Sequence, residues 1–139
     1  MEIRSVDDHF AVAPQMQPED LAGLAAAGFV AVICNRPDGE EPGQPPLDDM
    51  RSAAQAAGLA FHHIPVAGGL FPPAAIAAFA AVRRGTPGKV LAYCRTGTRS
   101  ITLDALANIG ALSVDGRIAR AKVAGYDLTA LAAQMEGGG

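Results

Sequence analysis

Residues 89–100 read KVLAYCRTGTRS, and this stretch decides the fold. Its first five residues form a continuous, largely apolar run, which is typical of a strand buried in a parallel sheet. Cys94 comes directly after the run, a short polar loop with Gly97 follows, and an apolar pattern from Ile101 indicates a helix. We therefore predict a strand, a turn and a helix in that order, with Cys94 at the carboxyl edge of a sheet.

Two more apolar runs, 29–34 and 59–66, precede this strand. The three runs begin about thirty residues apart, the length of a strand–helix–strand unit. Helices are predicted between and after them, and a hairpin before them: helices at 18–27, 47–57, 73–84, 101–109, 118–123 and 128–135, and the hairpin from 3–6 and 10–12. The alternation predicts an α/β fold of three layers, with a mainly parallel central sheet covered on both faces.

Composition fits one compact domain over residues 1–136, with 137–139 expected to be a flexible tail. Hydrophobic residues make up 50% of the chain and charged residues 18%, which excludes a disordered chain. The net charge of −3 argues against binding to nucleic acid or to an anionic membrane. The sequence has no transmembrane run and no disulfide-rich pattern, so we expect a cytoplasmic location.

The loop after Cys94 has the features of an anion-binding site. Its backbone N–H groups can converge on one point in front of a helix N-terminus, and Gly97 permits the necessary bend. Arg99 adds a fixed positive charge, and the Ser100 hydroxyl could hydrogen-bond the Cys94 sulfur when that sulfur leaves. Such surroundings favour a thiolate nucleophile at Cys94 over a merely buried thiol. The remaining anion-binding positions of the predicted loop are Arg95, Thr96 and Thr98.

Cys34 also ends a predicted strand, but no comparable loop follows it. The simpler interpretation is a small side chain packed in the core. The alternative is a resolving partner, because two neighbouring strand ends could bring Cys34 within disulfide reach of Cys94.

The loop resembles the active-site loops of two families. Protein tyrosine and dual-specificity phosphatases place five residues between the cysteine and the arginine, whereas four lie between Cys94 and Arg99. Rhodanese sulfurtransferases often have the shorter spacing, and their cysteine carries a persulfide instead of a phosphate. By this resemblance, the shorter spacing between Cys94 and Arg99 favours sulfur transfer over phosphoryl transfer.

A longer match resembles one family in particular. Residues 34–41 (CNRPDGEE), 44–45, 63–66 and 93–100 are similar to the phosphatase-like domain of β-lactamase hydrolase-like proteins, which is also described as a sulfurtransferase family. The resemblance covers roughly residues 3–135 and implies the fold of dual-specificity phosphatases, in the phosphotyrosine phosphatase superfamily. Some relatives carry a fused metallo-β-lactamase-like persulfide dioxygenase, which implies a functional link to such an enzyme and to sulfide detoxification.

The choice between the two reactions depends on a general acid, which a phosphatase uses to protonate the leaving alkoxide. Residues 65–72, where the resembling phosphatases carry this aspartate, contain no carboxylate. A persulfide donor or thiosulfate leaves as a stable anion and needs no proton. The sequence therefore favours a rhodanese-like sulfurtransferase that forms a Cys94 persulfide, with a cysteine-dependent phosphatase as the alternative and a non-catalytic anion-binding module as the third hypothesis.

Three further residues lie in or near the expected site. Asp38 is a substitute acid or, more simply, a turn residue in Pro-Asp-Gly. Arg36 either adds positive potential or pairs with Glu40 or Glu41. Arg95 is expected to point to solvent and help to attract anionic donors.

We expect no cofactor and no metal, because the sequence has no nucleotide fingerprint and no zinc-ligand spacing. His62 and His63 are consecutive on a strand and should point to opposite faces. The expected partners are a small anionic sulfur donor, thiosulfate or glutathione persulfide, and a thiol or cyanide acceptor.

Overall fold

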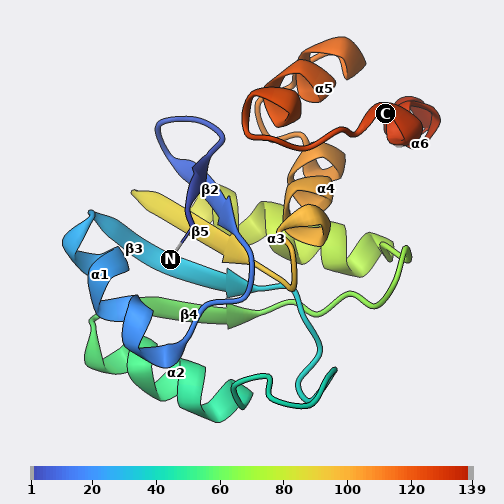
Figure 1. The fold of residues 1–139 in the computed structure, drawn as a ribbon. Coiled ribbons are helices and arrows are strands. Elements are labelled where there is room, and N and C mark those ends of the chain that lie inside the picture. Colours follow the sequence, from blue (N-terminus) through green and yellow to red (C-terminus); the bar gives the residue numbers. More distant parts are fainter. Residues whose placement is uncertain (1, 138–139) are drawn as a thin grey trace.

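The computed structural model describes residues 2–137 and is built on a sheet of five strands (Figure 1). These are β1 (Arg4–Ser5), β2 (Phe10–Ala13), β3 (Phe29–Cys34), β4 (Ala60–His63) and β5 (Lys89–Tyr93). Their order across the sheet is β1-β2-β5-β3-β4, and only β1 runs antiparallel to its neighbour. The sequence prediction of a leading hairpin and a mainly parallel sheet is confirmed.

Helices cover both faces of this sheet. Buried side chains of α1 (Leu21–Ala26) and α2 (Leu47–Ala56), including Leu24 and Met50, pack with Val32 and Leu91 on one face. On the other face, Phe79 and Ile101 pack with Ile33, from α3 (Pro73–Gly85) and α4 (Thr98–Ala107). The remaining helices are η1 (Pro18–Asp20), α5 (Val114–Val123), η2 (Thr129–Leu131) and α6 (Ala132–Gly137). This is the three-layer arrangement that the sequence predicts.

Element boundaries differ from the sequence prediction at several places. The α4 helix begins at Thr98, three residues before the predicted start at 101, so Arg99 and Ser100 lie in its first turn. The α5 helix begins at Val114, four residues before the predicted start, because the Ser113 side chain accepts a hydrogen bond from the N–H of Gly116. The β4 strand is shorter than the predicted 59–66, since the chain leaves the sheet after His63. The α6 helix ends at Gly137, and the rest of the predicted tail 137–139 lies outside the described residues.

The carboxyl ends of β3 and β5 form the edge where the site lies. Cys34 pairs with Tyr93 in the parallel register, and the N–H of Asn35 donates to the carbonyl of Tyr93 at 2.8 Å. Loops 35–46, 64–72 and 94–97 therefore leave the sheet at the same edge (Figure 1). Within residues 2–137, no helix combines the length and apolar character needed to cross a membrane.

Candidate active site

Cys94 lies at the foot of the loop between β5 and α4. Its Sγ accepts a hydrogen bond from the N–H of Gly97 at 3.1 Å, so the loop curls back over the sulfur. Gly97 has a φ of +94°, and a Cβ there would lie 2.1 Å from the hydroxyl oxygen of Tyr126. That hydroxyl donates to the carbonyl of Thr96 at 3.0 Å. Both the backbone conformation and the packing against Tyr126 therefore require glycine at position 97.

Most amide groups of this loop are available to a ligand. Within residues 2–137, the N–H groups of Arg95, Thr96, Arg99 and Ser100 have no hydrogen-bond partner. The last two belong to the first turn of α4, where the helix dipole adds positive potential. An anion bound here would meet several donors at once.

The Cys94 side chain is covered, with an exposed fraction of 0%. Above the loop is a pocket of about 310 Å³, which is lined by Glu40, Glu41, Gly68, Arg95 and Arg99. An anion that enters this pocket meets the two arginines first. Contact between the substrate and the sulfur therefore requires a local movement of the covering groups.

Arg99 is held in place on its outer side. Its Nη1 donates to the carbonyl of Val66 at 2.8 Å and to Glu40 Oε2 at 2.9 Å, and its Nη2 donates to Glu40 Oε1 at 2.8 Å. These hydrogen bonds to Glu40 are the main cause of a raised pKa of Arg99, and the nearby Cys94 also contributes. The guanidinium is thus anchored to two loops, through Glu40 and the Val66 carbonyl.

Glu40 lies between two arginines. Arg36 is 1% exposed and donates from Nε to Glu40 Oε1 at 2.8 Å, from Nη2 to Glu41 Oε1 at 2.5 Å and from Nη1 to Gln15 Oε1 at 2.9 Å. The hydrogen bonds from Arg99, followed by those from Arg36, lower the pKa of Glu40 to about 2. Of the two expectations for Arg36, the structure shows the pairing with Glu40 and Glu41, and Glu40 links Arg36 to Arg99. Added positive potential at the loop stays a prediction.

A buried polar link joins the loop to β3. Ser100 is 0% exposed and donates from Oγ to Asn35 Oδ1 at 2.9 Å, while Asn35 Nδ2 donates to the carbonyl of Ile64 at 2.9 Å. Ser100 thus fixes the first turn of α4 in this structure, and its contact with a departing sulfur stays a prediction. Asn35 and Glu40 are two residues that sequence reasoning did not assign to the site. The available signal was that Asn35 directly follows the strand end at Cys34 and that Glu40 lies in the loop after it.

Cys34 has surroundings of a different kind. Its thiol donates to the carbonyl of Arg36 at 3.5 Å, and burial raises the pKa of Cys34. Both cysteines are free. Because Cys34 pairs in register with Tyr93, it shares a face with that residue, and Cys94 follows on the opposite face. The geometry supports core packing for Cys34 and does not favour a disulfide with Cys94.

The other expected residues take structural or peripheral positions. Asp38 accepts a hydrogen bond from the N–H of Leu47 at 3.0 Å, so it caps the start of α2 instead of supplying an acid to the pocket. The Arg95 side chain is 63% exposed and lies 3.4 Å from Glu41. Thr96 Oγ1 donates to Thr98 Oγ1 at 3.0 Å, so both hydroxyls stay within the loop. Among the described residues, no three His, Cys, Asp or Glu side chains converge as metal ligands.

The sheet is mainly parallel, Cys94 directly follows its central strand, and Arg99 lies in the first turn of the next helix. These features together indicate the class of protein to which the chain belongs. The chain has the α/β fold of the tyrosine and dual-specificity phosphatases. The family model "Beta-lactamase hydrolase-like protein, phosphatase-like domain" matches residues 2–111, and the chain belongs to this family. The resemblance identified from the sequence is therefore confirmed.

Similar proteins and structures support the assignment. The chain is 39% identical to a β-lactamase hydrolase-like protein of Agrobacterium fabrum over 137 residues and 37% identical to one of Xylella fastidiosa over 123 residues. These matches cover 94% and 88% of the chain but only 31% and 28% of the relatives, so it spans less than a third of their length.

Among solved structures, a candidate phosphatase from Neisseria meningitidis has 33% identity and a TM-score of 0.88, with coverage of 100% of this chain and 99% of that one. Tk-PTP has a TM-score of 0.72 at 21% identity, with coverage of 97% and 93%, and shows the shared fold alone.

Proposed function

We propose that this chain is a cysteine-dependent phosphatase-like enzyme in which Cys94 is the nucleophile. The observation that carries the proposal is the loop after Cys94: the Gly97 N–H donates to the sulfur, neighbouring amides are free, and Arg99 lines the pocket above the loop. The sequence alone favours sulfur transfer. The family and the phosphatase-like relatives support phosphoryl transfer better than sulfur transfer, so we place phosphoryl transfer first.

The reaction would proceed in two steps. The Cys94 thiolate attacks the phosphorus of a phosphomonoester, an S–P bond forms, and the P–O bond breaks with its electron pair on the leaving oxygen. The amides of the loop and Arg99 hold the phosphoryl oxygens and stabilise the charge of the transition state. Water then attacks the phosphocysteine, which releases inorganic phosphate and returns the thiolate.

The surroundings restrict the substrates of this reaction. Glu40 is the carboxylate that contacts Arg99, and its pKa of about 2 keeps it ionised at neutral pH. Loop 65–72 contains no carboxylate. A general acid usually contributes on the order of 10² to 10⁴ in rate, so substrates whose leaving group departs without a proton are favoured, such as aryl phosphates.

Sulfur transfer is the second candidate, and the same missing acid favours it. The Cys94 thiolate would attack the outer sulfur of thiosulfate, the S–S bond would break, and sulfite would leave with the electron pair. Cyanide or a thiol would then attack the outer sulfur of the Cys94 persulfide and restore the thiolate. Glutathione persulfide is the corresponding organic donor, and a persulfide dioxygenase would act on the same pool of persulfides.

A side-by-side assay tests the proposal. Wild-type protein, Cys94→Ser and the matched Cys34→Ser variant receive p-nitrophenyl phosphate, thiosulfate with cyanide, or glutathione persulfide. Phosphate release that needs Cys94 and not Cys34 supports the first candidate. Thiocyanate formation with a sulfur adduct on Cys94, and no phosphate release, reverses the order. Binding of sulfate or phosphate with neither activity indicates a non-catalytic anion-binding module and overturns both reactions.

A further inference from the structure

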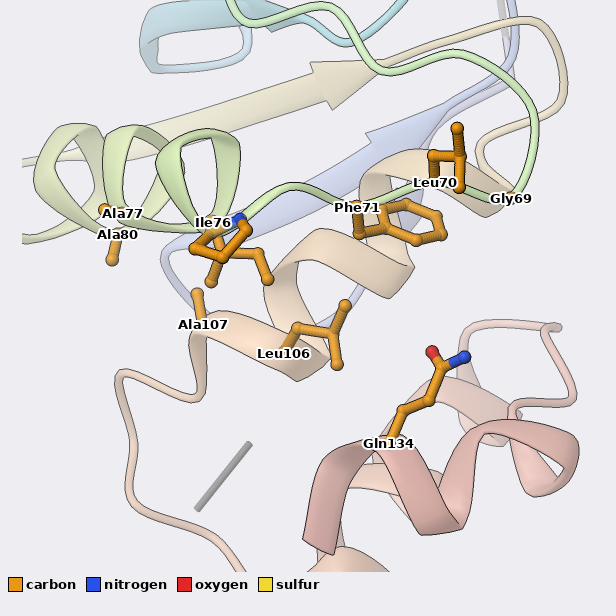
Figure 2. Close-up of a pocket in the computed structure, with 10 residues that line it drawn as sticks. Gly69, Leu70, Phe71, Ile76, Ala77, Ala80, Leu106, Ala107 and Gln134 are labelled. Carbon is orange, nitrogen blue, oxygen red and sulfur yellow. The ribbon is translucent and has the colours of Figure 1, made fainter. Parts of the chain in front are cut away.

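An apolar groove of about 700 Å³ lies between loop 69–71 and helices α3, α4 and α6 (Figure 2). Loop residues 69–71 form one wall, Ile76 and Ala77 of α3 a second, and Leu106 of α4 a third, with Gln134 reaching in from α6. Gln134 is the only polar side chain among the described residues that line it. The groove has the size and the apolar character of a small-molecule site.

The groove and the anion pocket share one loop. Gly68 lines the anion pocket and Gly69, the next residue, lines the groove. The loop is fixed close to this junction, because the Val66 carbonyl accepts a hydrogen bond from Arg99 Nη1 at 2.8 Å. The α4 helix makes the same connection, with its first turn at the anion loop and Leu106 at the groove.

The character of the surface changes sharply across this junction. Four charged side chains line the pocket on one side, Arg95 and Arg99 with Glu40 and Glu41, whereas no charged residue in the described part lines the groove on the other. Leu70, which lines the groove next to this junction, is 75% exposed and therefore accessible to a ligand. A ligand that covers both regions can place an anionic group at the free amides of the Cys94 loop and an uncharged apolar group in the groove.

We infer that the substrate is an amphiphilic anion, whose oxyanion head lies in the Cys94 loop and whose apolar tail lies in the groove. Only the placement of the oxyanion head at the Cys94 loop rests on the proposed function; the placement of the tail does not. The inference extends that function by naming the class of substrate, a monoester or sulfane donor with an alkyl or aryl tail. Each methylene that enters the groove should increase the affinity about fourfold.

Isothermal titration with n-alkylphosphonates from methyl to octyl, below their micelle concentrations, tests the inference on wild-type protein. The C–P bond resists hydrolysis, so binding is measured without turnover. Ala77→Glu places a carboxylate in the groove at an exposed helical position. Ala78→Glu is the matched control, because Ala78 is exposed on the same helix but does not line the groove.

The expected result is an affinity that rises with chain length in wild type and in Ala78→Glu, and that rises much less in Ala77→Glu. Binding of methylphosphonate with no gain in affinity from longer chains would refute the inference that the groove binds a tail. The proposed function would not be affected. A gain that Ala77→Glu does not reduce would place the tail elsewhere and also refute that inference. Titration with 1-octanol tests the two proposals separately. If octanol binds, Ala77→Glu abolishes that binding and no phosphonate binds, the groove is an apolar binding site. The Cys94 loop is then not an oxyanion site, which overturns the proposed function and the amphiphilic substrate.

Discussion

Cys34 and Cys94 lie at the ends of neighbouring parallel strands and are almost equally buried. The hydrogen bonds of their sulfur atoms, however, run in opposite directions. The Cys34 thiol donates to a backbone carbonyl, and burial raises its pKa, so it stays a neutral core thiol. The Cys94 sulfur instead accepts a hydrogen bond from an amide, in a loop whose Arg99 lines the adjoining pocket. The two buried sulfur atoms thus differ in hydrogen bonding: Cys34 acts as a donor and Cys94 as an acceptor. The proposed nucleophile is the sulfur that accepts, because N–H donors favour a thiolate.

The strongest test of this comparison replaces each cysteine in turn. Cys94→Ser should lower turnover by on the order of 10⁴ or more, because removal of a nucleophile disables the whole site. Cys34→Ser should leave kcat within about threefold, since that thiol touches no reacting group. Steady-state kinetics on the active substrate measures both. Equal losses in the two variants would contradict the assignment of separate roles.

Gly97 tests whether the shape of the loop, and not the cysteine alone, makes the difference. Gly97→Ala should lower kcat/KM by about 10² to 10³, because the loss of aligned amide donors has that effect in oxyanion sites. The contact with Tyr126 should also lower the free energy of unfolding, measured in denaturant.

Gly39→Ala is the matched control for Gly97, since Gly39 also has a positive φ but open space around it. It should show the cost of the backbone conformation alone, about 1 kcal/mol. A Gly97→Ala protein no less stable and no less active than Gly39→Ala would show that the contact with Tyr126 is unimportant.

Glu40 tests the anchoring of Arg99. Glu40→Gln should lower kcat/KM by about 10²-fold, mainly through kcat, because a guanidinium displaced by about 1 Å no longer aligns with the reacting group. Glu41→Gln is the control, since Glu41 pairs with Arg36 and Arg95 but not with Arg99. A lower KM in Glu40→Gln with an unchanged kcat would mean instead that Glu40 competes with the substrate for Arg99.

The smallest effect concerns pH. The pKa of Glu40 in the folded protein, about 2, lies below its ordinary value of 4.5, so its pairing stabilises the fold fully above that ordinary value. The stabilisation is lost as the pH falls from 4.5 toward 2. The difference in unfolding free energy between wild type and Glu40→Gln should therefore be constant near neutral pH and shrink across this acidic window. A difference that instead changes between about pH 6 and 8 would contradict the low pKa.

Much of the site was predictable because it is local in the chain. Cys94, Gly97 and Arg99 lie within six residues, and the strand before them and the helix after them fix where they meet. The partners of Arg99 were not predictable in this way. Glu40 is fifty-nine residues away and the Val66 carbonyl thirty-three, and only the folded sheet brings their loops to one edge.

The sequence by itself determined the order of strands and helices, because apolar periodicity and helix-terminal residues are read within a few turns of chain. It also determined the family, through two short motifs. The tertiary structure decided what each polar side chain does: Asp38 caps α2, Ser100 donates to Asn35, and Glu40 holds Arg99. The reason is that short-range hydrogen bonds and ion pairs depend on separations of a few ångströms, which the packing of distant segments sets.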